Sequence, residues 1–158
     1  MTPTGSPLVI AAAQGRAMPG PGDLTILNLA AADTGNQLSL ADYTLDPGVG
    51  PPLHRHARED ETFWILEGEV TFVVEDVEHI AGVGTCVFAP RGTAHTFKNR
   101  GDRPARMLVI VTPPRNFEEF YAAFLAIIRQ PFVPDEAMRQ IAALGGRHGL
   151  EILGPNPL

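Results

Sequence analysis

From residue 8 to residue 113 the chain alternates short apolar runs with clusters of Gly, Pro, Asp and Asn, and the clusters recur every eight to twelve residues. This spacing predicts an all-β domain built as a sandwich or barrel. We expect eight strands, at Leu8–Ala12, Asp23–Leu29, Leu38–Leu45, Thr62–Leu66, Glu69–Val74, Thr85–Phe88, His95–Asn99 and Ala105–Val111. The last strand is apolar on both faces, which indicates a position inside a packed two-sheet body.

Beyond Pro113 the apolar spacing changes to three and four residues, the period of an amphipathic helix. The apolar positions are Phe117, Phe120, Tyr121, Phe124, Leu125 and Ile128. Asn116 is a suitable N-cap, and Pro131 and Pro134 are expected to end the helix. We expect this aromatic helix to cover a sheet edge or a dimer contact rather than to act as a lid.

A second short helix is predicted near Asp135–Leu144, ended by Gly145 and Gly146, and residues 150–158 are predicted to form an extended tail. The chain of 158 residues fits one domain with an appendage. We divide it into an N-terminal segment with the first strands of the barrel (1–37), a core with both motifs described below (38–112), and a C-terminal helical segment with its tail (113–158).

Composition narrows the possible partners. The formal net charge of -6 argues against nucleic acid as a partner. The sequence contains no long uncharged apolar run, so we expect no membrane partner. Cys86 is the only cysteine, which excludes an internal disulfide and fits a cytoplasmic location. Because Cys86 lies in an apolar run, we expect a buried and unreactive thiol.

The first of two motifs contains Gly48, His54, His56, Glu61 and Gly68, separated by five, one, four and six residues. Side chains on a strand alternate between faces, so His54 and His56 point the same way. Glu61 lies an odd number of residues beyond His56, so a straight strand would turn it to the other face. The chain must therefore bend between them, and the polar residues 57–60 suit a turn or bulge.

The second motif contains Gly84, the turn Pro90–Gly92, His95 and Asn99. The tight turn is expected to deliver His95 from another strand, and the side-chain amide of Asn99 is expected to close the next turn. Three imidazoles and one carboxylate that meet at one centre are suitable ligands for a divalent transition-metal ion at about 2.0–2.2 Å. Such a site keeps a position open, as catalytic metal sites do.

Both motifs are similar to the two signature motifs of the cupin superfamily at every signature position. The wider chain, over most of residues 38–158, resembles small single-domain bacterial cupins related to quercetin dioxygenase. This resemblance implies a double-stranded β-helix, or jelly-roll barrel, with a short C-terminal helical segment. It implies one divalent ion (Ni, Fe, Mn, Cu, Co or Zn) and no organic cofactor, with the ion held by His54, His56, Glu61 and His95.

The resemblance also implies an activity, namely a dioxygenase that activates an enol or a flavonol-like small molecule, with Glu61 accepting the hydroxyl proton as general base. Two alternatives stay open. One is a metal-containing binding or sensing protein without turnover. The other is an isomerase or decarboxylase, in which Arg91, Arg100 or Arg106 would hold a substrate carboxylate. Many cupins pair through sheet edges, so a homodimer is expected.

The positions of residues along the expected strands predict which of them line the pocket. Phe63 and Ile65 share a face with Glu61, and Phe97 shares one with His95, so these three are expected to line the substrate pocket. Glu59 and Asp60 are interpreted as solvated loop residues. His79, expected in a hairpin tip, and His148, expected near the chain end, are also interpreted as solvated.

Overall fold

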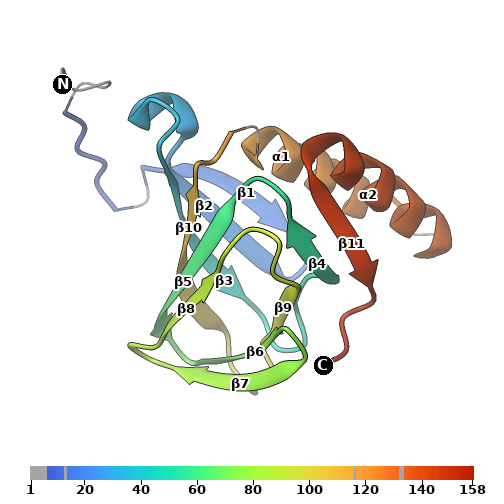
Figure 1. Ribbon diagram of the computed structural model, residues 1–158. Helices are drawn as coiled ribbons and strands as arrows, with labels where there is room; N and C mark the ends of the chain where they lie inside the picture. The colour runs from blue at the N-terminus through green and yellow to red at the C-terminus, as the bar shows by residue number, and fades with distance from the viewer. Residues whose placement is uncertain (1–6, 13, 116, 132–133) are drawn as a thin grey trace.

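A computed structural model describes residues 7–12, 14–115, 117–131 and 134–158 and shows two antiparallel sheets that face each other (Figure 1). The six-stranded sheet has the order β1 (Arg16–Gly20), β2 (Asp23–Leu29), β3 (Ser39–Leu45), β10 (Ala105–Thr112), β5 (Asp60–Glu67) and β8 (Cys86–Ala89). The five-stranded sheet has the order β11 (Leu150–Gly154), β4 (Leu53–His56), β9 (His95–Lys98), β6 (Glu69–Val74) and β7 (Val77–Gly82). The predicted all-β barrel is confirmed.

The core lies between the two sheets and is formed by side chains that alternate along the strands. On β5, Phe63 and Ile65 are almost fully buried, whereas Trp64 between them is 46% exposed on the outer face. Cys86 lies directly opposite Trp64 on the edge strand β8 and is exposed. The prediction of a buried thiol is therefore wrong, because the apolar run around Cys86 has one face toward solvent.

Seven of the eight expected strands are present with small shifts at their ends. The strand expected at Leu8–Ala12 is wrong: residues 7–11 have no regular structure, and Val9 is 93% exposed. The first strand is instead β1. Its sequence did not indicate a strand, because it contains Pro19 and Gly20, which are uncommon within strands. His79 lies within β7 and not in a hairpin tip, although it is exposed as expected.

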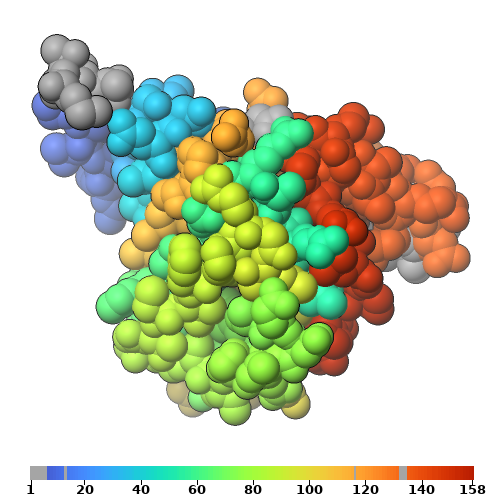
Figure 2. Space-filling model, viewed as in Figure 1, coloured from blue at the N-terminus to red at the C-terminus, as the bar shows by residue number. Residues whose placement is uncertain are grey.

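Two helices pack on the side of the barrel remote from the β6–β7 hairpin (Figures 1 and 2). They are α1 (Phe117–Ile128) and α2 (Pro134–His148), and a 3-10 helix, η1 (Ala31–Thr34), follows β2. The N-cap assigned to Asn116 lies outside the described residues. No helix among the described residues is long and apolar enough to span a bilayer.

The limits of α2 differ from the expectation at both ends. Pro134 begins this helix, in the first-turn position where a missing N–H costs nothing. Gly145 lies inside it, where a Cβ would come within 2.6 Å of the Leu150 carbonyl oxygen, so glycine permits close packing against β11. The helix ends before Gly149, whose φ of +79° is left-handed. His148 is half-buried against the ring of Phe120 and is not fully solvated.

Candidate metal centre

Three strands position the four motif side chains. His54 and His56 lie on β4, Glu61 on β5 and His95 on β9. His54 and His95 are direct cross-strand partners. The C-terminal residues expected to form a tail instead form β11, which pairs with β4 and places Leu150 opposite His56. Strand β4 is thus held from both sides.

The turns foreseen in the sequence complete this arrangement. The chain bends at residues 57 and 58, and Glu61 then faces the same interior as the two histidines of β4. Gly92, with a φ of +87°, donates its backbone N–H to the His56 carbonyl oxygen at 2.6 Å. The Asn99 amide donates to the carbonyls of Leu45 and Arg103, which closes the turn after β9.

The four side chains converge on one point. Glu61 Oε2 lies 2.8 Å from Nε2 of His95, 3.2 Å from Nε2 of His56 and 4.0 Å from Nε2 of His54. One ligand atom from each residue lies within 4.8 Å of all the others, and all four residues are buried. We call His54, His56, Glu61 and His95 the metal-binding cluster, because this set could hold one metal ion.

The hydrogen bonds of the rings fit metal binding. His54 Nδ1 lies 2.8 Å from the Pro52 carbonyl oxygen, and His95 Nδ1 lies 3.0 Å from the Thr93 carbonyl oxygen. A carbonyl only accepts, so Nδ1 of each ring donates to it, and Nε2 is the ring nitrogen left to face the centre, where it could bind an ion. Nε2 of His56 is buried without a hydrogen-bond partner among the described residues. An ion at the centre would satisfy it.

The comparisons with known proteins agree with this geometry. Residues 41–111 match the cupin domain family. The protein TT1209 of Thermus thermophilus is 30% identical, and its crystal structure superposes with a TM-score of 0.51 over 56% of this chain and 81% of that chain. A sugar phosphate isomerase from a cupin superfamily, from Silicibacter pomeroyi, is also 30% identical, with a TM-score of 0.50 over 62% of this chain and 68% of that chain. This protein belongs to the cupin superfamily.

Two further similarities show how far the cupin likeness extends. The structure of KdgF from Halomonas sp. superposes with a TM-score of 0.64 at 16% identity, over 72% of this chain and 99% of that chain, which shows a shared fold. The tetracenomycin polyketide synthase protein TcmJ of Streptomyces glaucescens is 30% identical over 47% of this chain. The chain spans only 50% of the length of TcmJ.

Glu59 is the residue at this cupin site that sequence reasoning missed. It is 2% exposed, not solvated, and its Oε2 lies 3.6 Å from Nδ1 of His56. His56 thus has a carboxylate where the other two rings have a backbone carbonyl. The only sequence signal is the spacing of three residues from His56. The neighbouring Asp60 faces outward, where Arg91 donates to both of its carboxylate oxygens.

Burial and neighbouring charges act in opposite directions on the pKa values of Glu61 and His56, and in the same direction on that of His54. Burial raises the pKa of Glu61, but the positive charge of the adjacent His56 and the hydrogen bond with His95 hold it well below 4.5. Burial lowers the pKa of His56, but the adjacent carboxylates of Glu61 and Glu59 raise it to about 9. Burial and the charges of His95 and His56 lower the pKa of His54 to about 3. Without an ion, Glu61 and His56 therefore form a buried ion pair.

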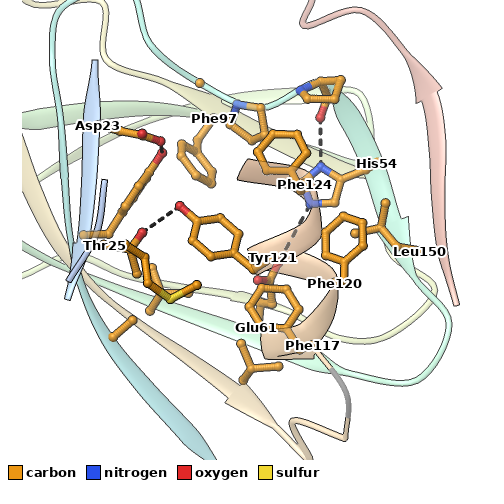
Figure 3. A pocket seen from close by; sticks show the side chains of 18 of the residues that line it. Asp23, Thr25, His54, Glu61, Phe97, Phe117, Phe120, Tyr121, Phe124 and Leu150 are labelled. Carbon is orange, nitrogen blue, oxygen red and sulfur yellow. Dashed lines mark hydrogen bonds and ion pairs between the residues drawn. The ribbon is translucent and has the colours of Figure 1, made fainter. Parts of the chain in front are cut away.

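The cluster opens on a cavity of about 590 Å³ between the sheets and the helices (Figure 3). Phe63 and Phe97 line it, whereas Ile65 lies in the core and does not. Helix α1 forms one wall, which the expectation of a sheet-edge or dimer cover did not foresee. Its lining residues are Phe117, Glu118, Phe120, Tyr121, Phe124 and Ile128.

No lysine or arginine is among the described residues that line this cavity. The three arginines considered as carboxylate clamps form ion pairs elsewhere: Arg91 with Asp60, Arg100 with Glu78, and Arg106 with both Asp42 and Glu67. The cavity therefore offers a metal-binding cluster and largely apolar walls, but no lysine or arginine among its described lining residues to bind an anionic group.

Proposed function

We propose that this cupin is a metal-dependent enzyme that binds a largely apolar, ring-containing enol or phenol and promotes its reaction with dioxygen. The observation that carries the proposal is the opening of the metal-binding cluster into a largely apolar, aromatic-lined cavity with no lysine or arginine among its described lining residues. A cavity of about 590 Å³ lies in the usual range for small-molecule sites. Flavonols match this size and chemistry.

Each part of the site has a role in this proposal. A divalent ion held by the metal-binding cluster would lower the pKa of an enol hydroxyl and orient it. Glu61 is ionised and faces the cavity, so its carboxylate is suited to accept the hydroxyl proton. The apolar walls exclude water and hold the ring system by contact with Phe63, Phe97 and Phe117.

The cavity chemistry argues against phosphorylated sugars and small dicarboxylates. Such substrates need charge-assisted hydrogen bonds, which arginine or lysine usually provides. Besides the metal-binding cluster, the ionisable side chains that line the cavity are Asp23, Glu118, Tyr43 and Tyr121, and none of these carries a positive charge. Outside the metal-binding cluster, a substrate anion would therefore find no cationic partner among these side chains.

An oxygen electrode tests the proposal. Protein purified without added metal is assayed for its ion and then reconstituted separately with Ni, Fe, Mn, Cu and Co. We expect oxygen uptake with flavonols or smaller enediols in at least one metal form and none in the metal-free protein. Tight binding of these compounds with no uptake in any metal form would contradict it and favour a binding protein.

A second candidate uses the same enolate without oxygen, in a cyclisation or isomerisation. It is favoured by the 30% identity to a polyketide synthase protein, because polyketide chains are rich in enolisable carbonyls. The two reactions differ in one measurement. An oxidative enzyme consumes one dioxygen for each product molecule, whereas a cyclase or isomerase forms product equally well under nitrogen.

A further inference from the structure

The cavity carries a second polar group of side chains apart from the metal-binding cluster. Thr25 Oγ1 lies 2.7 Å from the hydroxyl oxygen of Tyr121, and the hydroxyl of Tyr43 donates to Asp23 Oδ2 at 2.5 Å. All four residues line the cavity. In Figure 3, Asp23 and Thr25 lie on one side of the view and His54 on the other, with Tyr121 between them. We call these four residues the hydroxyl end.

Strand register brings the hydroxyl end together. Thr25 on β2 is the direct cross-strand partner of Tyr43 on β3. Asp23 precedes Thr25 by two residues, so both point to the same face of the sheet. Tyr121 reaches this face from helix α1, and the hydroxyls of Thr25 and Tyr121 meet although 96 residues separate them. Two strands and a helix thus converge on one small polar area.

Aromatic rings connect the metal-binding cluster to the hydroxyl end along the helix side of the cavity. The ring of Phe117 lies 5.7 Å from the ring of His56 and 6.2 Å from the ring of Tyr121, between centroids. The Phe117 and Tyr121 rings are nearly parallel, with planes 12° apart. This wall ends at the hydroxyl of Tyr121.

A second row of rings follows the barrel side. Phe63 lies 6.1 Å from His95 and 5.5 Å from Phe97, and Phe97 lies 6.0 Å from Tyr43. Both walls therefore run from a histidine of the cluster to a tyrosine hydroxyl. A flat molecule of two or three rings fits between such walls, with one end at the ion and the other at the hydroxyls.

The hydroxyl end has unused hydrogen-bonding capacity. The Thr25 and Tyr121 hydroxyls share one hydrogen between them, so the second hydrogen is left to bond another group. The hydroxyl oxygen of Tyr43 donates to Asp23 and keeps its own acceptor capacity. Burial raises the pKa of Tyr121 to about 12 and that of Tyr43 well above 10, so both stay protonated at neutral pH.

We propose that the hydroxyl end binds a second oxygen of the substrate, a hydroxyl or carbonyl remote from the oxygen bound at the metal, through Thr25 and Tyr121. The substrate class is therefore a polyhydroxylated or keto-bearing aromatic rather than a plain hydrocarbon enol. This inference rests on the proposed function, because it assumes that the first oxygen is held at the metal-binding cluster.

The test measures equilibrium binding of three flavonols to the zinc-loaded protein, because zinc has no redox chemistry and prevents turnover with dioxygen. The probes are 3-hydroxyflavone, 3,4′-dihydroxyflavone and 3,7-dihydroxyflavone, which carry the added hydroxyl at opposite ends of the ring system. The variants are Tyr121→Phe and Thr25→Val, which remove opposite members of one hydrogen bond. Thr44→Val is the matched control, since Thr44 is adjacent to Tyr43 and lies on the outer face of the sheet.

We expect one dihydroxyflavone to bind wild-type protein about three- to tenfold more tightly than 3-hydroxyflavone, as one added hydrogen bond provides. Either variant should reduce the ratio of the dihydroxyflavone affinity to the 3-hydroxyflavone affinity to about twofold or less, while Thr44→Val keeps the wild-type ratio. Equal affinities in the wild type, or a preference that survives in both variants, would overturn this inference alone. Failure of all three probes to bind would overturn the proposed function and the inference with it.

Discussion

The two ends of the cavity are assembled in different ways, and the metal-binding cluster is the more deeply buried of the two. At the metal-binding cluster, Glu61 and His95 meet across 34 residues, and both belong to short motifs bounded by turns. At the hydroxyl end, Thr25 and Tyr121 meet across 96 residues and depend on where a helix packs. The first end is locally encoded and holds opposite charges, whereas the second depends on tertiary packing and holds neutral hydroxyls. We therefore expect mutations to separate their effects.

The largest expected effect is a loss of catalytic rate when a residue of the metal-binding cluster is changed. Glu61→Gln removes the proposed proton acceptor and should lower the rate of flavonol-dependent oxygen uptake by about 10²- to 10⁴-fold. Glu118→Gln is the matched control at the opposite wall, where the Glu118 side chain accepts the Ala31 N–H. A Glu61→Gln enzyme that keeps its full rate with metal bound would contradict the role of this carboxylate.

The next effect concerns stability where helix α1 packs against the six-stranded sheet. Leu125 of α1 is 2% exposed and packs against Met18 of β1 and Leu27 of β2. Leu125→Ala should lower the free energy of unfolding by about 2–5 kcal/mol through lost contacts and a cavity. Denaturation measures this loss, and zinc affinity measured on the same folded variant should change by less than about twofold, since distant sites are usually independent. A parallel loss of zinc affinity would show that the two ends are coupled.

Removal of one histidine ligand gives the third effect. His56→Ala should weaken metal binding by about one to two orders of magnitude or more, because each ligand and its support contribute strongly. His79→Ala is the control, since His79 is exposed on β7. Competition with a chelator measures both affinities. Unchanged metal content in His56→Ala would remove that ring from the site.

Metal binding should also depend on pH in a defined direction. Because His56 has a pKa of about 9 in the metal-free protein, it is protonated at neutral pH and must lose that proton to bind an ion. Apparent zinc affinity should therefore rise about tenfold per pH unit from pH 7 until it levels near pH 9. Chelator competition at several pH values measures the slope. An affinity that does not change over this range would contradict the raised pKa.

The same shifts set the stability of the metal-free protein. A raised His56 pKa contributes stability that is complete below the unfolded value of about 6.5 and is lost as the pH rises through about 9. The lowered Glu61 pKa contributes stability above about 4.5 that is lost at acid pH. The lowered pKa of His54 also reduces stability below about 6.5. Thermal melts of the metal-free protein should therefore be highest near pH 6.5 and fall on both sides.

The smallest effect tests the residue that supports His56. Glu59→Gln should weaken zinc affinity by about tenfold, because it removes the carboxylate beside Nδ1 of His56. Asp60→Asn is the matched control, as Asp60 pairs with Arg91 outside the site. Equal affinities in the two variants would reduce Glu59 to a packing role.

The metal-binding cluster could be predicted from sequence because residues close to each ligand in the chain determine where that ligand points. The alternation of His54 and His56, the bend before Glu61 and the turn at Gly92 are all set by neighbouring residues. The environment of Glu59 could not be predicted, because the rotation of a bent segment decides which of its carboxylates is buried. Cys86 was misjudged for a related reason, since apolar residues also occupy the outer face of an edge strand.

The hydroxyl end could not be predicted because it arises from contacts between distant segments. Periodicity identified the strands that carry Thr25 and Tyr43 and the helix that carries Tyr121, but not the register or the docking that joins them. The strand β11 was missed for the same reason: its residues pair with β4, and nothing within residues 150–154 indicates that partner.

The most direct test of the central claim is a crystal structure of the native protein with anomalous diffraction data at the absorption edge of its metal. The account predicts one anomalous peak, about 2.0–2.2 Å from Nε2 of each of the three histidines and from one Glu61 oxygen. A fully occupied peak elsewhere, or no peak between these side chains in protein crystallised with excess divalent metal, would contradict it.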